Sequence, residues 1–141
     1  MQQIAPEVKV YQIAPAKAYT ATASSTGLSV VPGESPSFDA CAVINVGAAT
    51  GTPTSYTAAI VIEESATVGG TYTTNKTVGT ATNTGGAQSV HVPVTINPAK
   101  PFLRVTATIA FVGGTSPALP IGVDLLVSQQ VASDGNVVAI A

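Results

Sequence analysis

Residues 102–127 read FLRVTATIAFVGGTSPALPIGVDLLV, and this segment has the clearest strand pattern in the chain. Its apolar residues alternate with other residues on both sides of a Gly-Gly-Thr-Ser-Pro loop. They are Leu103, Val105, Ala107, Ile109 and Phe111 before the loop, and Leu119, Ile121, Val123, Leu125 and Val127 after it. Successive side chains of a β-strand point to opposite faces, so a period of two buries one face of each segment. The stretch predicts two strands, and the five-residue loop predicts that they form a hairpin.

The same period continues through most of the chain. The residues that share one face of their strand are Phe38, Ala40, Ala42, Ile44 and Val46, then Tyr56, Ala58, Ile60 and Ile62, then Val90, Val92, Val94 and Ile96. Turn residues separate these runs, and none has the period of an amphipathic helix. The pattern therefore predicts an all-β fold, an antiparallel β-sandwich or partly closed barrel of six to seven strands. Pro93 lacks a backbone N–H, so its strand should lie at a sheet edge or contain a bulge.

The apolar phase of these strands also predicts the hydrophobic core. The predicted core residues are Phe38, Ile44, Tyr56, Ile60, Ile62, Val92, Val94, Leu103, Val105, Ile109, Phe111, Ile121, Val123 and Leu125. Residues 1–25 contain Pro6 and Pro15 and show no sustained period, which predicts an extended N-terminal arm. The β-sandwich domain is then 26–128, and 129–141 is a C-terminal arm or tail in which Ser133 to Asn136 could turn a second, smaller hairpin. Deletion of residues 1–25 is expected to leave the sandwich folded.

Charge is scarce in this 141-residue chain. Only 9% of its residues are Asp, Glu, Lys or Arg, whereas about a quarter is usual. A surface so poor in charge is typical of a protein that is covered by neighbours, although a neutral, Thr-rich surface that is simply soluble is the alternative. Five cations and a net charge of −2 do not favour nucleic-acid binding. The first residues do not resemble a signal peptide and no apolar run has membrane-spanning length, so synthesis in the cytoplasm without membrane association is expected.

The sequence contains few groups that could carry out chemistry. His91 is the single histidine and is expected to be exposed, and Cys41 is the single cysteine and is expected to be a half-buried, inert thiol. Neither a catalytic triad nor a zinc site can be assembled around them. Glu63 and Glu64 are adjacent in a strand and point to opposite faces, so they cannot act as a carboxylate pair. We therefore predict a protein that is not an enzyme and has no catalytic, cofactor-binding or metal-binding residues.

Arg104 is the only arginine, and its phase places it on the outward face of its strand. In the predicted hairpin it lies diagonally across from Asp124, within reach of a long side chain. The sequence leaves two interpretations open. Arg104 either forms a cross-strand ion pair of less than about 1 kcal/mol or anchors a partner protein.

Four short motifs between residues 62 and 127 resemble a pattern in small structural proteins of tailed bacteriophages. They are Glu63-Glu64-Ser65, Gly69-Gly70-Thr71-Tyr72-Thr73, Phe102-Leu103-Arg104 and Gly114-Thr115-Ser116-Pro117. The resemblance is to head-decoration (cement) proteins and related virion β-sandwiches. It implies a virion protein on the capsid surface that contacts the major capsid protein and other copies of itself.

These observations lead to one main functional hypothesis and two alternatives. The main hypothesis is a capsid decoration protein, a homotrimer or homodimer that stabilises the head by binding across major capsid protein seams. The alternatives are a carbohydrate- or receptor-binding module of a phage tail or fibre and a tail-tube-like, self-assembling protein. Apolar residues of the two ends could pair with a neighbour's sheet edge. The candidate partner-binding residues are Ile4, Val8, Val10, Tyr11, Ile13, Arg104, Val137, Val138 and Ile140.

Overall fold

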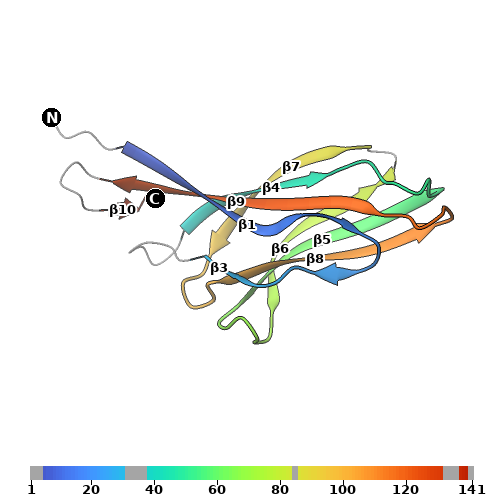
Figure 1. The fold of residues 1–141 in the computed structure, drawn as a ribbon. Coiled ribbons are helices and arrows are strands. Elements are labelled where there is room, and N and C mark those ends of the chain that lie inside the picture. Colours follow the sequence, from blue (N-terminus) through green and yellow to red (C-terminus); the bar gives the residue numbers. More distant parts are fainter. Residues whose placement is uncertain (1–4, 31–37, 84–85, 132–136, 140–141) are drawn as a thin grey trace.

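The computed structural model describes residues 5–30, 38–83, 86–131 and 137–139, and its elements are all β-strands (Figure 1). The strands are β1 (Ala5–Tyr19), β2 (Ala23–Ser24), β3 (Leu28–Ser29), β4 (Phe38–Val46), β5 (Ser55–Ser65), β6 (Thr73–Thr82), β7 (Gln88–Ile96), β8 (Phe102–Val112), β9 (Leu119–Val131) and β10 (Val137–Ala139). The described residues include no helix that is long and apolar enough to cross a membrane.

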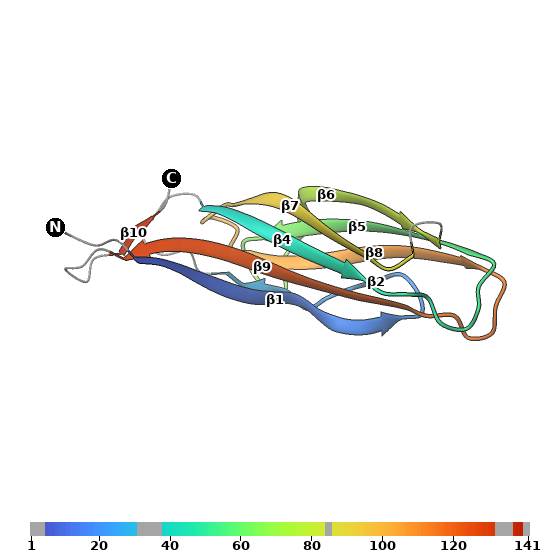
Figure 2. The same ribbon diagram turned by 90° about the horizontal axis from the view of Figure 1, so that it is seen from above.

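The strands form two antiparallel five-stranded sheets that pack face to face (Figure 2). Sheet A has the order β1-β9-β4-β7, and β10 also pairs with β9. Sheet B has the order β2-β8-β5-β6, and β3 also pairs with β8. The sheets do not close into a barrel, so the predicted all-β sandwich is confirmed. Strand β7 lies at the edge of sheet A, as Pro93 predicts.

The strand order defines the topology. The two short strands β2 and β3 pair with successive parts of β8 and together occupy one position in sheet B. With these two counted as one, the chain crosses from sheet to sheet at every connection up to β9 except the β5–β6 hairpin. Interleaved Greek keys of this kind form a jelly roll, an architecture used by viral capsid domains and by lectins.

The predicted hairpin of β8 and β9 is wrong, because the two strands lie in different sheets. Their connecting loop packs instead on the loop that joins β4 to β5. The Thr115 amide donates to the Gly51 carbonyl at 2.8 Å. Gly114 has a φ of +84°, and a Cβ at this position would lie 2.6 Å from the Gly51 oxygen. The Gly-Gly pair thus allows close approach of two loops that span the roughly 10 Å between the sheets.

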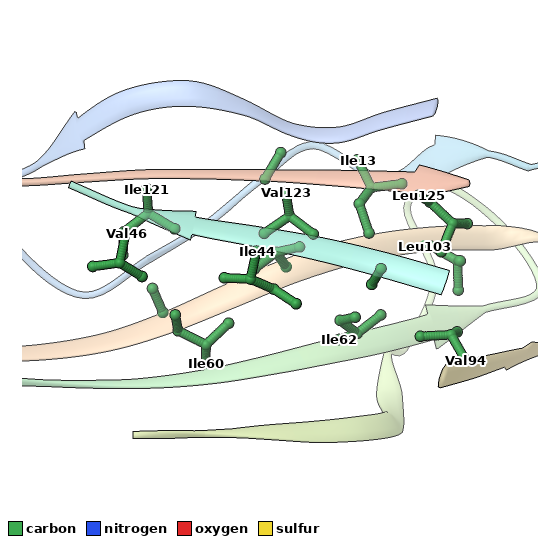
Figure 3. Close-up of a cluster of buried hydrophobic side chains, with 14 of the residues drawn as sticks. Ile13, Ile44, Val46, Ile60, Ile62, Val94, Leu103, Ile121, Val123 and Leu125 are labelled. Carbon is green, nitrogen blue, oxygen red and sulfur yellow. The ribbon is translucent and has the colours of Figure 1, made fainter. Parts of the chain in front are cut away.

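The apolar faces of both sheets meet in one core (Figure 3). Most of the predicted core residues are buried, whereas Val92 and Phe111 are only partly buried. The side chain of Phe38 lies outside the described residues. The core also contains residues that the predicted list did not include, among them Ile13, Tyr19 and Val30, which lie outside the predicted strands.

The predicted N-terminal arm is wrong for residues 5–19, which form an integral strand of sheet A. Strand β1 pairs with β9 from Ala5 opposite Val131 to Tyr19 opposite Leu119. The Ile13 side chain is 1% exposed. Two register shifts between Gln12 and Lys17 interrupt the alternation of side chains, which is why this strand shows no period of two.

The C-terminal tail also contributes to sheet A. Strand β9 continues to Val131, and β10 returns alongside it with Val137 opposite Val131. The second, smaller hairpin is therefore confirmed, although its turn, residues 132–136, lies outside the described residues. Strand β10 lies at the end of the sandwich where β1 begins (Figure 1).

Candidate interaction surfaces

Arg104 belongs to a polar cluster on the outer face of sheet B. Its Nε lies 2.7 Å from the Glu63 Oε2 atom. The Thr106 hydroxyl donates to the same oxygen at 2.7 Å, and the guanidinium carbon lies 4.0 Å from the Tyr72 ring centroid. The predicted pairing with Asp124 is wrong, because β8 pairs with β5, where Glu63 is opposite Arg104.

Neighbouring segments hold this cluster in place. The Tyr72 hydroxyl donates to the Val68 carbonyl at 2.9 Å, which ties the β5–β6 loop to the aromatic ring. Gly27 lies so close that a Cβ there would be 1.8 Å from the same hydroxyl. Beside the cluster, the Asn75 amide donates to Glu64 at 2.7 Å and to the Thr95 carbonyl of β7 at 2.9 Å. These contacts join the two sheets and the loops at this end of the sandwich.

Glu63 has a perturbed pKa. Burial raises the pKa, but hydrogen bonds from Thr106 and Arg104 and the charge of Arg104 outweigh it, so the pKa is lowered from its ordinary value of 4.5. A carboxyl group whose pKa is lower in the folded state than in the unfolded state stabilises the protein at pH values above the unfolded-state pKa. This contribution is lost as the pH falls through the folded-state pKa.

Glu63→Gln is therefore expected to reduce the free energy of unfolding by about 1 kcal/mol at pH 7. The difference from the unmutated protein should shrink as the pH falls below 4.5, the ordinary pKa of the group, because protonation of Glu63 then removes from the unmutated protein the charge that the variant already lacks. Urea titrations at several pH values between 7 and 3 measure both quantities. A difference that does not change with pH would contradict the assignment.

The predicted partner-binding residues fall into different environments. Val10 is 59% exposed and is available to a partner, whereas Ile13 is buried in the core and is not. Tyr11 is half-buried and packs against the core. Val8 lies in β1, and Val137 and Val138 lie in β10, where the backbone alone is described. Ile4 and Ile140 lie outside the described residues.

His91 and Cys41 lie on two adjacent strands of sheet A. His91 is exposed on the outer face of β7, as predicted. Its imidazole makes no hydrogen bond or ion pair with a described residue. Cys41 is a half-buried free thiol in β4. The described residues contain no group of three or more His, Cys, Asp or Glu side chains that could hold a metal ion.

A pocket with a volume of about 380 Å³ lies between β1 and residues 25–28. Tyr19 is one of its lining residues, and its buried hydroxyl has no hydrogen-bond partner among the described residues. Burial raises the pKa of this hydroxyl. The Lys17 amine lies 4.8 Å from the centroid of the same ring. A lysine held against an aromatic ring covers the core here.

An apolar row crosses the outer face of sheet A. The registers place Val10 opposite Leu126, Leu126 opposite Cys41, and Cys41 opposite Pro93, so one outward residue from each of the four strands joins the row. Val10 and Pro93 are exposed, and Leu126 and Cys41 are partly exposed. Of the described side chains that point outward from this sheet, Asp124 alone is charged.

No protein-family model and no curated protein matches the chain.

Sequence reasoning alone did not find the Arg104 cluster. Glu63, Tyr72 and Arg104 come from three of the motifs that carry the phage resemblance, and they meet in one network. The opposite charges of Glu63 and Arg104, each on the outward face of its strand, were a signal for this cluster that is visible in the sequence. It could not be used, because β5 and β8 are not neighbours in the sequence.

Proposed function

We propose that the protein is a structural component of a virus particle. It acts as a capsid decoration protein that binds across the seams between major capsid protein subunits. The apolar row of Val10, Leu126, Cys41 and Pro93 on a nearly uncharged sheet face carries this proposal. The centres of protein interfaces are depleted in charge, and an apolar row exposed to water is stabilised by a partner that covers it.

Two further observations support a binding role. The polar side chains of the Arg104 cluster hold strands and loops together. The one carboxylate at the centre of the cluster, that of Glu63, accepts hydrogen bonds from Arg104 and Thr106 and so has a structural role. The jelly-roll order is one that capsid domains use, although fold alone does not define function. The resemblance to tailed-phage decoration proteins supports the capsid as the partner.

The alternative of a carbohydrate-binding module has less support. Sugar sites depend on exposed aromatic rings and convergent polar groups. Tyr19 and Tyr56 are buried, and the Tyr72 ring lies against the Arg104 guanidinium.

Co-sedimentation with shells of the major capsid protein from the same virus tests the proposal. Leu126→Asp places a charge in the apolar row and is expected to weaken shell binding by at least about tenfold, because the charge is desolvated at the interface. Val61→Asp is the matched control, since Val61 is partly exposed on the outer face of sheet B. Unchanged binding of Leu126→Asp, or no binding of the unmutated protein, would contradict the proposal.

A further inference from the structure

The outer edge of β1 is open at the beginning of the strand. Among the described strands β1 pairs with β9 alone. At Ile13 its edge is covered, because the Ser25 hydroxyl donates to the Ile13 carbonyl at 2.8 Å. Residues 5–12 pair regularly with β9 on one side and have no described strand on the other.

The backbone groups that point outward from this edge can be identified from the hydrogen-bond pattern. The Gly47 amide donates to the Pro120 carbonyl at 2.8 Å, so even-numbered residues of β9 bond to β4 and odd-numbered ones bond to β1. Lys9 is opposite Val127, so odd-numbered residues of this part of β1 bond to β9. Even-numbered residues therefore direct their N–H and C=O groups outward. Pro6 fits this parity, since its missing N–H would be on the open side.

We propose that this edge binds the same edge of a second copy of the chain. The two β1 strands pair antiparallel about a two-fold axis at Val8, and sheet A becomes continuous across the dimer. Each Val8 N–H donates to the Val8 carbonyl of the other copy, and each Val10 N–H donates to the other Pro6 carbonyl. Edge-to-edge pairing of this kind gives affinity through main-chain hydrogen bonds.

The charges at positions 7 and 9 select the second copy and this register. An axis at Val8 places Glu7 opposite Lys9 of the other copy twice, at non-hydrogen-bonded positions where paired residues approach most closely. An axis at Glu7 or at Lys9 places like charges opposite each other, and an axis at Pro6 pairs two residues without an N–H. An axis at Val10 leaves both charges without a partner. Only the register centred on Val8 is complementary.

The inference deepens the proposed function by naming one of its partners, another copy, and by defining how the two copies join. It concerns the protein alone in solution. If the protein does not dimerise, the proposed capsid binding through the apolar row is not contradicted. If it does not bind capsids, the proposed dimer is not contradicted.

Charge reversal with sedimentation equilibrium on the purified full chain tests the inference. Glu7→Lys and Lys9→Glu each place like charges opposite each other twice and are expected to raise the dimer dissociation constant by about tenfold. The double variant, Glu7→Lys with Lys9→Glu, restores opposite charges and should dimerise like the unmutated protein. Lys76→Glu on β6 changes the net charge by the same amount as Lys9→Glu and should not affect the dimer.

Mixing the two single variants gives a second readout that does not depend on the stability of either. One copy then carries lysine at both positions and the other carries glutamate at both, so the mixture should form a heterodimer. Val8→Pro removes an N–H group that points to the open edge and leaves the hydrogen bonds to β9 intact. This variant should be a folded monomer. A wild-type protein that is monomeric at every concentration would overturn the inference, as would a dimer insensitive to the reversals and to mixing.

Discussion

A chain that begins at residue 26 is expected not to fold. Deletion of residues 1–25 removes β1, which covers the whole length of β9, and it removes Ile13 and Tyr19 from the core. Burial of one large apolar side chain contributes about 1.5–3 kcal/mol, and the total stability of a domain is about 5–15 kcal/mol. The loss of a complete strand with two such side chains therefore approaches the total. This outcome is the opposite of what an N-terminal arm outside the sandwich predicts.

Circular dichroism, thermal melting and proton NMR of the purified fragment measure the result. The matched control is a chain that begins at residue 5, since it keeps every described strand and should melt cooperatively. A cooperative melt of the 26–141 fragment at the temperature of the full chain would show that β1 is dispensable.

Ile62→Ala is expected to reduce the free energy of unfolding by about 2–5 kcal/mol. The Ile62 side chain is 0% exposed at the centre of the core (Figure 3), so the truncation leaves a cavity between two well-packed sheets. Val61→Ala is the matched control, because the neighbouring residue points outward from the same strand and should cost less than about 1 kcal/mol. Urea titration gives both values, and similar costs for the two variants would show that the phase of β5 is misassigned.

The sequence was sufficient for the fold class and for the inward face of most strands. Ile44, Ile62 and Leu125 each stand in a run with a strict period of two, and the physical reason for that period is local. The position of β7 at a sheet edge was also predictable, because the missing N–H of Pro93 is a property of one residue.

The partner of each strand could not be predicted from the same pattern. An apolar phase defines which face a strand buries but not which strand lies beside it, and this is why Arg104 was expected near Asp124 and is found beside Glu63. Strand β1 was missed for a different reason. Its bulges place Ile13 and Tyr19 in the core without an alternating sequence.

The candidate surfaces were predictable only in part. Val10 was expected to be available to a partner and is exposed, but the row that it forms with Leu126 depends on the register between β1 and β9. The Arg104 cluster likewise depends on strands far apart in the sequence. A surface assembled from several strands depends on which strands are neighbours in the sheet, and the residue pattern of each strand does not specify its neighbours.

The pairing of the first long strand with the last has a consequence for how the protein reaches its native state. Sheet A cannot be completed until Leu119–Val131 is available to lie between β1 and β4, so β1 must wait for nearly the whole chain to be synthesised. Closing so long a loop is entropically costly, and all-β domains dominated by such pairings fold in about milliseconds to seconds. During that interval β1 has no partner strand, and its exposed strand edge is prone to aggregate. The rate of synthesis and the concentration of nascent chains should therefore influence the yield of folded protein more than its final stability does.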